Sequence, residues 1–111
     1  MRAEDVRTVG VIGGGLMGSG IAEVVARAGQ VAVVLETSDE LVERGRQRIE
    51  TSTLRAVERN RLEADERVAV LGRISLTTDV QDLADVDLVI EAATEDHDTK
   101  VGMFGLSLIH I

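Results

Sequence analysis

The chain has 111 residues, of which 44% are apolar, and it carries a net charge of −8. This length allows one small domain with a thin core, and the absence of cysteine excludes disulfides, thiolate catalysis and cysteine-based zinc sites. With only His97 and His110 as histidines, a His-rich metal site is excluded as well. The acidic balance argues against a nucleic-acid partner. No apolar run approaches the roughly 20 residues of a membrane span. From the position of Met1, only a few residues before the first predicted strand, we expect no signal peptide. We therefore expect a cytoplasmic protein without a nucleic-acid or membrane partner.

Strands and helices alternate in the first half of the chain. A β-branched run predicts a strand over residues 8–12, helical spacing of apolar residues predicts a helix over 16–28, and a continuous apolar run predicts a buried strand over 31–35. A long helix is then expected over about residues 39–59, begun by a capping box of Thr37 and Glu40. Its predicted inner stripe comprises Leu41, Val42, Gly45, Ile49, Ser52, Ala56 and Val57.

The second half continues the alternation. We expect a helix over about 64–71, a short strand at 74–76, one or two helical turns within 79–85, a fourth strand around 88–90 and a helix from Asp96 onward. Strands that alternate with helices in this way predict an α/β domain with a parallel sheet and right-handed connections.

A glycine-rich turn between the first strand and the first helix predicts a dinucleotide site. Gly13 permits the sharp turn, Gly15 lets the backbone approach a pyrophosphate, and Gly18 lets helix and strand pack closely. The helix then offers unpaired N–H groups and its positive dipole end to the phosphates. A glycine pattern alone is weak evidence, but here it has a strand before it and a helix after it.

An acid at the end of the second strand extends this site. Glu36 stands about 20 residues after the glycine turn, where an acid hydrogen-bonds the adenosine ribose hydroxyls. The alternative is a solvated charge at a strand end. A carboxylate there repels a 2′-phosphate, and no arginine follows it before Arg44, so the predicted cofactor is NAD and not NADP.

The run from Val9 to Ala22, VGVIGGGLMGSGIA, resembles the amino terminus of the 3-hydroxyacyl-CoA dehydrogenase family, including bacterial 3-hydroxybutyryl-CoA dehydrogenases. The stretches 45–57, 77–79 and 87–96 are similar to the family in order and spacing. The resemblance implies a Rossmann-type parallel sheet with helices on both faces, truncated after the fourth strand and the following helix. It also implies an NAD-dependent oxidation of 3-hydroxyacyl-CoA to 3-oxoacyl-CoA, in fatty-acid or butyrate metabolism, by a parent enzyme that is a homodimer.

The resemblance also implies roles for individual residues. The cofactor-binding set is Gly13, Gly15, Leu16, Met17, Gly18, Glu36, Ala92, Glu95 and Lys100, of which the last three lie where the family contacts the nicotinamide half. Glu95 and Lys100 could instead be an exposed loop acid and a helix-surface charge. Ser52 and Arg59 match positions that meet the coenzyme A part of the substrate, and seven residues on a helix place them on one face. The alternative for this pair is a solvated basic face, and we expect His97 to be a loop surface residue.

The family's catalytic His–Glu pair lies beyond the matched region, so no catalytic residue is assigned here and this chain alone is expected to be inactive. Residues 1–105 are interpreted as an incomplete NAD-binding domain whose fourth strand is an exposed edge. Residues 106–111 lack the charged amphipathic pattern before them and can be encoded by the recognition end of a sequencing transposase. They are interpreted as a non-native tail, in which His110 has no function.

Two other functions remain open on the sequence. One is the front half of a different two-domain hydroxyacid dehydrogenase, of the 3-hydroxyisobutyrate or 6-phosphogluconate type, although the long helical insertion after Glu36 argues against it. The other is a non-catalytic module that binds NAD.

Overall fold

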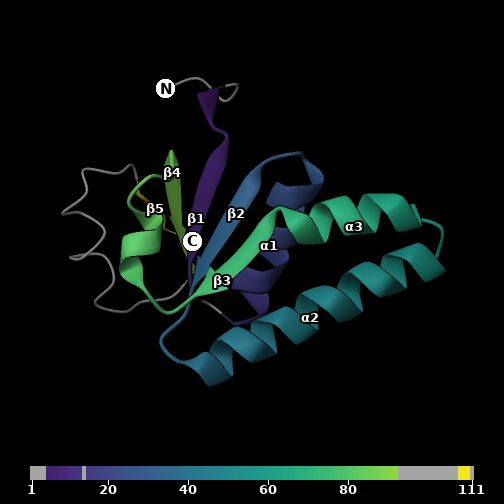
Figure 1. The fold of residues 1–111 in the computed structure, drawn as a ribbon, viewed down its shortest axis with the longest axis horizontal. Coiled ribbons are helices and arrows are strands. Elements are labelled where there is room, and N and C mark those ends of the chain that lie inside the picture. The colour runs from purple at the N-terminus through teal and green to yellow at the C-terminus, as the bar shows by residue number, and fades with distance from the viewer. Residues whose placement is uncertain (1–4, 14, 93–107, 111) are drawn as a thin grey trace.

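The computed structural model describes residues 5–13, 15–92 and 108–110, and strands alternate with helices along it (Figure 1). In chain order the elements are β1 (Thr8–Ile12), α1 (Leu16–Arg27), β2 (Val31–Leu35), α2 (Asp39–Glu58), α3 (Ala64–Gly72), β3 (Ile74–Thr77), the 3₁₀ helix η2 (Val80–Leu83), β4 (Leu88–Glu91) and β5 (Leu108–His110). The elements predicted up to the fourth strand are confirmed, with ends that differ by at most two residues. The helix predicted from Asp96 lies outside the described residues.

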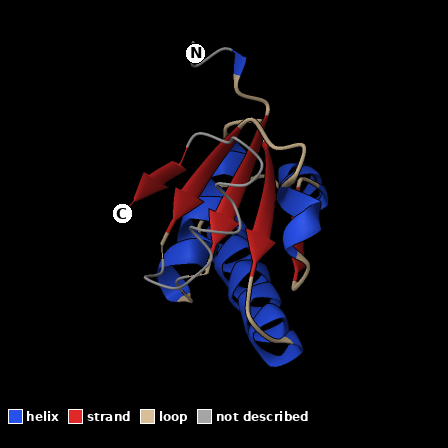
Figure 2. Cartoon of the chain, turned by 90° about the vertical axis from the view of Figure 1, so that its left-hand side faces the viewer, coloured by secondary structure: helices blue, strands red, loops and turns tan. Residues whose placement is uncertain are grey.

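All strand pairs in the sheet are parallel, in the order β3-β2-β1-β4-β5. The chain moves outward from β1 through β2 to β3, and then crosses to the other side of β1 to form β4, so the strands lie side by side with β1 in the middle (Figure 2). The predicted parallel Rossmann-type sheet is thereby confirmed. The reversal of strand order between β1 and β4 creates the position at which open α/β sheets bind ligands.

The expectation that β4 is an exposed edge is wrong. The backbone of β5 pairs with β4 in parallel, with Val89 opposite Leu108 and Glu91 opposite His110. The pairing supplies partners for backbone groups that β4 would otherwise expose, which is the physical reason why a three-residue strand forms there. That residues 106–111 are a non-native tail stays a prediction.

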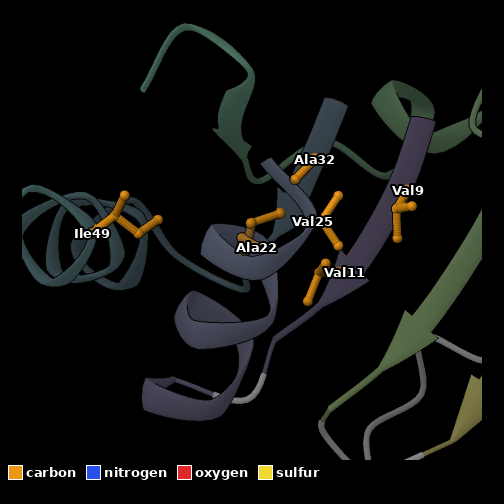
Figure 3. Packing of buried hydrophobic residues seen from close by; sticks show 7 residues of the cluster. Val9, Val11, Ala22, Val25, Ala32 and Ile49 are labelled. Atoms are coloured by element: carbon orange, nitrogen blue, oxygen red, sulfur yellow. The ribbon is translucent and has the colours of Figure 1, made fainter. Parts of the chain in front are cut away.

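Two apolar clusters cover the two faces of the sheet. One lies under α1 and α2 and contains Val9, Val11, Ala22, Val25, Ala32, Val34 and Ile49. Figure 3 shows Ala22 and Val25 of α1 between the strands and Ile49 of α2. The other cluster lies under η2 and contains Ile12, Leu35, Leu83, Val86 and Val89. Each fully buried Val, Leu or Ile contributes about 1.5–3 kcal/mol, so aliphatic side chains sustain the core on both faces of the part of the sheet that the structure describes.

The start of α2 differs from its prediction. The cap is Ser38, in an extended conformation with φ −152°, and its Oγ accepts a hydrogen bond from the backbone N–H of Leu41 at 3.2 Å. The expected capping box of Thr37 and Glu40 is therefore wrong. The helix begins one residue later than that box requires, which places the Ser38 hydroxyl over the free N–H groups of the first turn.

The inner stripe of α2 also needs one correction. Its buried residues are Gly45, Ile49, Thr53 and Ala56, so Thr53 takes the place expected for Ser52, which is exposed. The buried hydroxyl of Thr53 donates to the carbonyl oxygen of Ile49 at 2.8 Å. This bond satisfies a polar atom that would otherwise be costly to bury.

Asp87 connects the starts of β1 and β4. Its Oδ2 accepts hydrogen bonds from the backbone N–H groups of Arg7 at 2.8 Å and Thr8 at 3.0 Å. These two bonds lower the pKa of the Asp87 carboxyl, because they stabilise its charged form. They anchor the amino end of the central strand at the edge of the sheet opposite to the glycine turn.

Candidate functional site

Three of the predicted site residues are held side by side at the carboxyl edge of the sheet. The N–H of Gly13 donates to the last carbonyl of β2 at 2.7 Å, that of Glu36 to the last carbonyl of β3 at 2.9 Å, and that of Ala92 to the last carbonyl of β1 at 3.0 Å. In each case the hydrogen-bond ladder between two neighbouring strands continues by one bond to the residue that follows a strand. The backbone positions of Gly13, Glu36 and Ala92 are therefore set by the sheet itself.

The glycine turn leaves no space for side chains where it meets α1. Gly13 and Gly15 adopt φ angles of 57° and 53°, which non-glycine residues rarely take. A Cβ on Gly18 would collide with the carbonyl oxygen of Gly13, so α1 can pass this close only with glycine there. No side chain among the described residues caps the first turn of α1, and its N–H groups remain available to an anion.

Two large apolar side chains stand exposed beside this turn. Leu16 is 75% and Met17 is 53% exposed, although both belong to the first turn of α1. The structure thus brings these two predicted cofactor contacts next to the glycine turn, where a bound dinucleotide would cover them. Their roles as contacts remain predictions.

Glu36 is almost fully buried at the end of β2, with 5% of its surface exposed. Burial raises the pKa of its carboxyl above the ordinary value, and the positive charge of Arg48 opposes that rise. The alternative of a solvated strand-end charge does not fit this burial. A second acid, Glu91, ends β4 at 4% exposure, so two buried carboxyl groups lie at the same edge of the sheet.

A cleft of about 720 Å³ opens between α1 and α2, starting at Leu16 beside the glycine turn. Both residues predicted to meet coenzyme A, Ser52 and Arg59, line it. Six of the chain's eleven arginines also line this cleft: Arg27, Arg44, Arg48, Arg55, Arg59 and Arg61. Two of them are neutralised by ion pairs, Arg27 with Glu23 at 3.2 Å and Arg44 with Glu40 at 2.8 Å. The remaining four give the cleft a positive charge.

The sequence analysis missed Arg48 as a site residue. Its Nη1 is buried without a hydrogen-bond partner among the described residues, and it lies 3.7 Å from where a Cβ on Gly15 would stand. The spacing of Arg48 to Ser52 and Arg55, four and seven residues along one helix, was the signal that could have identified it. The guanidinium thus joins the arginine-lined cleft to the glycine turn.

Several predicted positions lie outside the described residues. These are Glu95, His97 and Lys100, while His110 is described only by its backbone pairing in β5. Within the described ranges no helix is long and apolar enough to cross a membrane, and no group of three or more acidic or histidine side chains could hold a metal ion.

Comparison with known proteins gives a consistent result. Residues 8–107 match the family described as 3-hydroxyacyl-CoA dehydrogenase, NAD binding domain. A 3-hydroxybutyryl-CoA dehydrogenase of Mycobacterium tuberculosis is 46% identical over 102 residues, which are 92% of this chain and 36% of that protein. A probable 3-hydroxybutyryl-CoA dehydrogenase of Deinococcus radiodurans is 46% identical over 95 residues, 86% of this chain and 34% of that protein.

Solved structures agree with these relatives. The crystal structure of (S)-3-hydroxybutyryl-CoA dehydrogenase from Ralstonia eutropha superposes with a TM-score of 0.78 at 38% identity, covering 89% of this chain and 35% of that one. The chain therefore spans about a third of the length of the relatives it matches.

Proposed function

The chain belongs to the NAD-binding domain family of 3-hydroxyacyl-CoA dehydrogenases, and we propose that it supplies the cofactor site of an enzyme that oxidises 3-hydroxyacyl-CoA to 3-oxoacyl-CoA. The observation that carries the proposal is the buried Glu36 fixed beside the glycine turn at the reversal of strand order. When bound, NAD accepts the hydride that leaves the substrate's hydroxyl-bearing carbon.

The residues of this chain bind and orient the cofactor in the proposal. The glycine turn and the first N–H groups of α1 hold the pyrophosphate, while the Glu36 carboxylate accepts hydrogen bonds from the adenosine ribose hydroxyls. Leu16 and Met17 cover the bound dinucleotide. Ala92 begins the loop after β4, and with Glu95 and Lys100 it is proposed, from the family resemblance, to contact the nicotinamide half.

The other end of the cleft is proposed to bind the substrate. Ser52 offers a hydroxyl and Arg59 a cation to the phosphates of coenzyme A, and both line the cleft that leads from the glycine turn. The relatives' names support an acyl-CoA substrate, of which 3-hydroxybutyryl-CoA is the short-chain example. We further propose that the parent enzyme works in the cytoplasm as a homodimer, without nucleic-acid or membrane partners; the mass of the full-length protein in solution tests the dimer.

Removing the Glu36 carboxylate tests the cofactor assignment. Glu36→Ala should weaken NAD binding by about 1–3 kcal/mol, which is roughly 5- to 150-fold, because a charge-assisted hydrogen bond is lost. Calorimetric titration of NAD and NADP into the chain and this variant measures it, with the exposed Glu43→Ala as the matched control. Tighter binding of NADP than of NAD by the unchanged chain, or an unaltered NAD affinity of Glu36→Ala, would overturn the assigned role.

A further inference from the structure

Arg48 has a position that packing alone does not explain. It projects from α2, far along the chain from the glycine turn, yet its Nη1 is buried against Gly15. That nitrogen has no hydrogen-bond partner among the described residues. Buried donors of charged groups are nearly always paired in folded proteins, so an unpaired one at the mouth of a binding site indicates an acceptor that a ligand brings.

Glu36 does not neutralise the Arg48 guanidinium through an ion pair. Glu36 experiences the charge of Arg48, but no ion pair joins the two side chains. An arginine that formed an ion pair with Glu36 would neutralise the acid and would no longer offer its N–H donors to a ligand. In the structure the Glu36 carboxylate and the Arg48 guanidinium are not joined by an ion pair, and Nη1 of Arg48 lies against Gly15.

The chemistry around Arg48 selects the ligand group. Gly15 belongs to the turn where the backbone comes closest to a dinucleotide's pyrophosphate, and a planar guanidinium matches phosphate oxygens well. The ribose hydroxyls are assigned to Glu36, whose carboxylate accepts hydrogen bonds from them. Coenzyme A is the less favoured occupant, because the buried Nη1 of Arg48 lies at Gly15 in the glycine turn, one helical turn before Ser52.

We propose that Arg48 is a phosphate-binding residue of the cofactor site, whose Nη1 donates a hydrogen bond to a pyrophosphate oxygen of the dinucleotide at Gly15. This inference rests on the proposed binding of NAD by this chain. It adds a side-chain cation to a pyrophosphate site that otherwise relies on backbone N–H groups and a helix dipole.

The test compares ligands with and without phosphate. NAD, ADP, adenosine and coenzyme A are titrated by NMR into the 111-residue chain and into Arg48→Met, Arg48→Lys and Arg46→Met. Arg46 stands two residues earlier on the same helix, pairs with Glu43 at 3.6 Å and does not line the cleft, so it is the matched control. Thermal unfolding of every variant shows whether the fold is retained.

We expect Arg48→Met to lower the affinity for NAD and ADP about tenfold or more and to leave the affinity for adenosine and coenzyme A unchanged. Arg48→Lys should recover part of the lost affinity. Arg46→Met should bind like the unchanged chain. Equal NAD affinity in Arg48→Met, an equal loss for adenosine and ADP, or a loss confined to coenzyme A would overturn the inference while the proposed NAD function stands. Failure of the unchanged chain to bind NAD would overturn both.

Discussion

At the scale of single residues, the site depends on a carboxyl group placed where water is scarce. The backbone N–H of Glu36 is bonded to β3, which fixes its backbone at the sheet edge, and its side chain is almost fully buried there. Burial raises its pKa, with the charge of Arg48 acting in the opposite direction. The acid form of Glu36 is therefore favoured by folding, whereas the ionised form is the one that accepts hydrogen bonds from both ribose hydroxyls.

This conflict predicts a pH dependence of binding and of stability. As the pH falls through the raised pKa of Glu36, NAD affinity should decrease, and it should do so at a higher pH than an ordinary glutamate would give. The free energy of unfolding should change in the opposite direction and decrease as the pH rises. A group whose pKa is raised by folding stabilises the protein below the pKa that it has in the unfolded chain, and this contribution is lost as the pH rises through its pKa in the folded chain.

Glu36→Gln checks both consequences. Calorimetry between weakly acidic and neutral pH should show a flatter NAD profile for the variant, and urea unfolding at neutral pH should show it to be more stable than the unchanged chain. Parallel NAD profiles for the two proteins would contradict the assignment of the titration to Glu36.

At the scale of elements, α2 and α3 are joined by a partly buried polar connection. The Oγ1 of Thr53, with no exposed surface, accepts a hydrogen bond from Nε of Arg67 at 3.0 Å, and the same guanidinium donates to the carbonyl of Glu50 at 3.1 Å. Thr53 in turn donates to Ile49. This network holds the wall of the arginine-lined cleft in its antiparallel hairpin with α3 (Figure 1).

Thr53→Val keeps the shape of the side chain and removes its hydroxyl. It should lower the free energy of unfolding by about 1–3 kcal/mol, because Nε of Arg67 loses its acceptor. Thr51→Val is the control, since Thr51 is exposed on the same helix and a change there should stay within about 0.5 kcal/mol. Urea denaturation compares the three proteins; equal stability of Thr53→Val would show that the connection contributes nothing.

The elements that local pattern determines were predictable from the sequence, and those that depend on distant contacts were not. The apolar runs and the glycine turn gave β1, β2, α1 and the parallel sheet, because period and turn chemistry are local. The cap at Ser38 and the buried Thr53 depend on where α2 begins and how it rotates against α1 and α3, which sequence spacing leaves uncertain by one residue. The strand β5 and the contact of Arg48 with Gly15 are long-range; for Arg48 the spacing to Ser52 and Arg55 indicates the helix face but not the contact with the glycine turn.

At the scale of the whole molecule, charge is distributed unevenly. The chain has 20 acidic and 12 basic residues, yet the cleft between α1 and α2 gathers six arginines, of which four have no ion pair among the described residues. An acidic protein with a positive cleft of this kind repels anions elsewhere on its surface and concentrates them at that cleft. Attraction of this kind weakens with added salt.

Coenzyme A binding should therefore depend on salt and on Arg59. Arg59→Met is expected to weaken coenzyme A about tenfold at low salt and to flatten the salt dependence, because one phosphate-directed cation is lost. NAD affinity should stay close to that of the unchanged chain. Calorimetric titrations at several salt concentrations measure this, with Arg46→Met as the control outside the cleft; an identical coenzyme A affinity for Arg59→Met would remove Arg59 from the site.

The hairpin of α2 and α3 has a consequence for the order in which the molecule opens. Its buried residues are few, namely Gly45, Ile49, Thr53 and Ala56 on α2 and Val70 on α3, whereas β1 is buried along most of its length between two strands. Local opening costs least where the fewest apolar contacts break, so the hairpin should swing away as a unit while the sheet stays closed. Amide hydrogens of the hairpin would then exchange with solvent before those of β1. A ligand that spans the cleft would slow that exchange selectively, because it joins the part that opens first to the part that opens last.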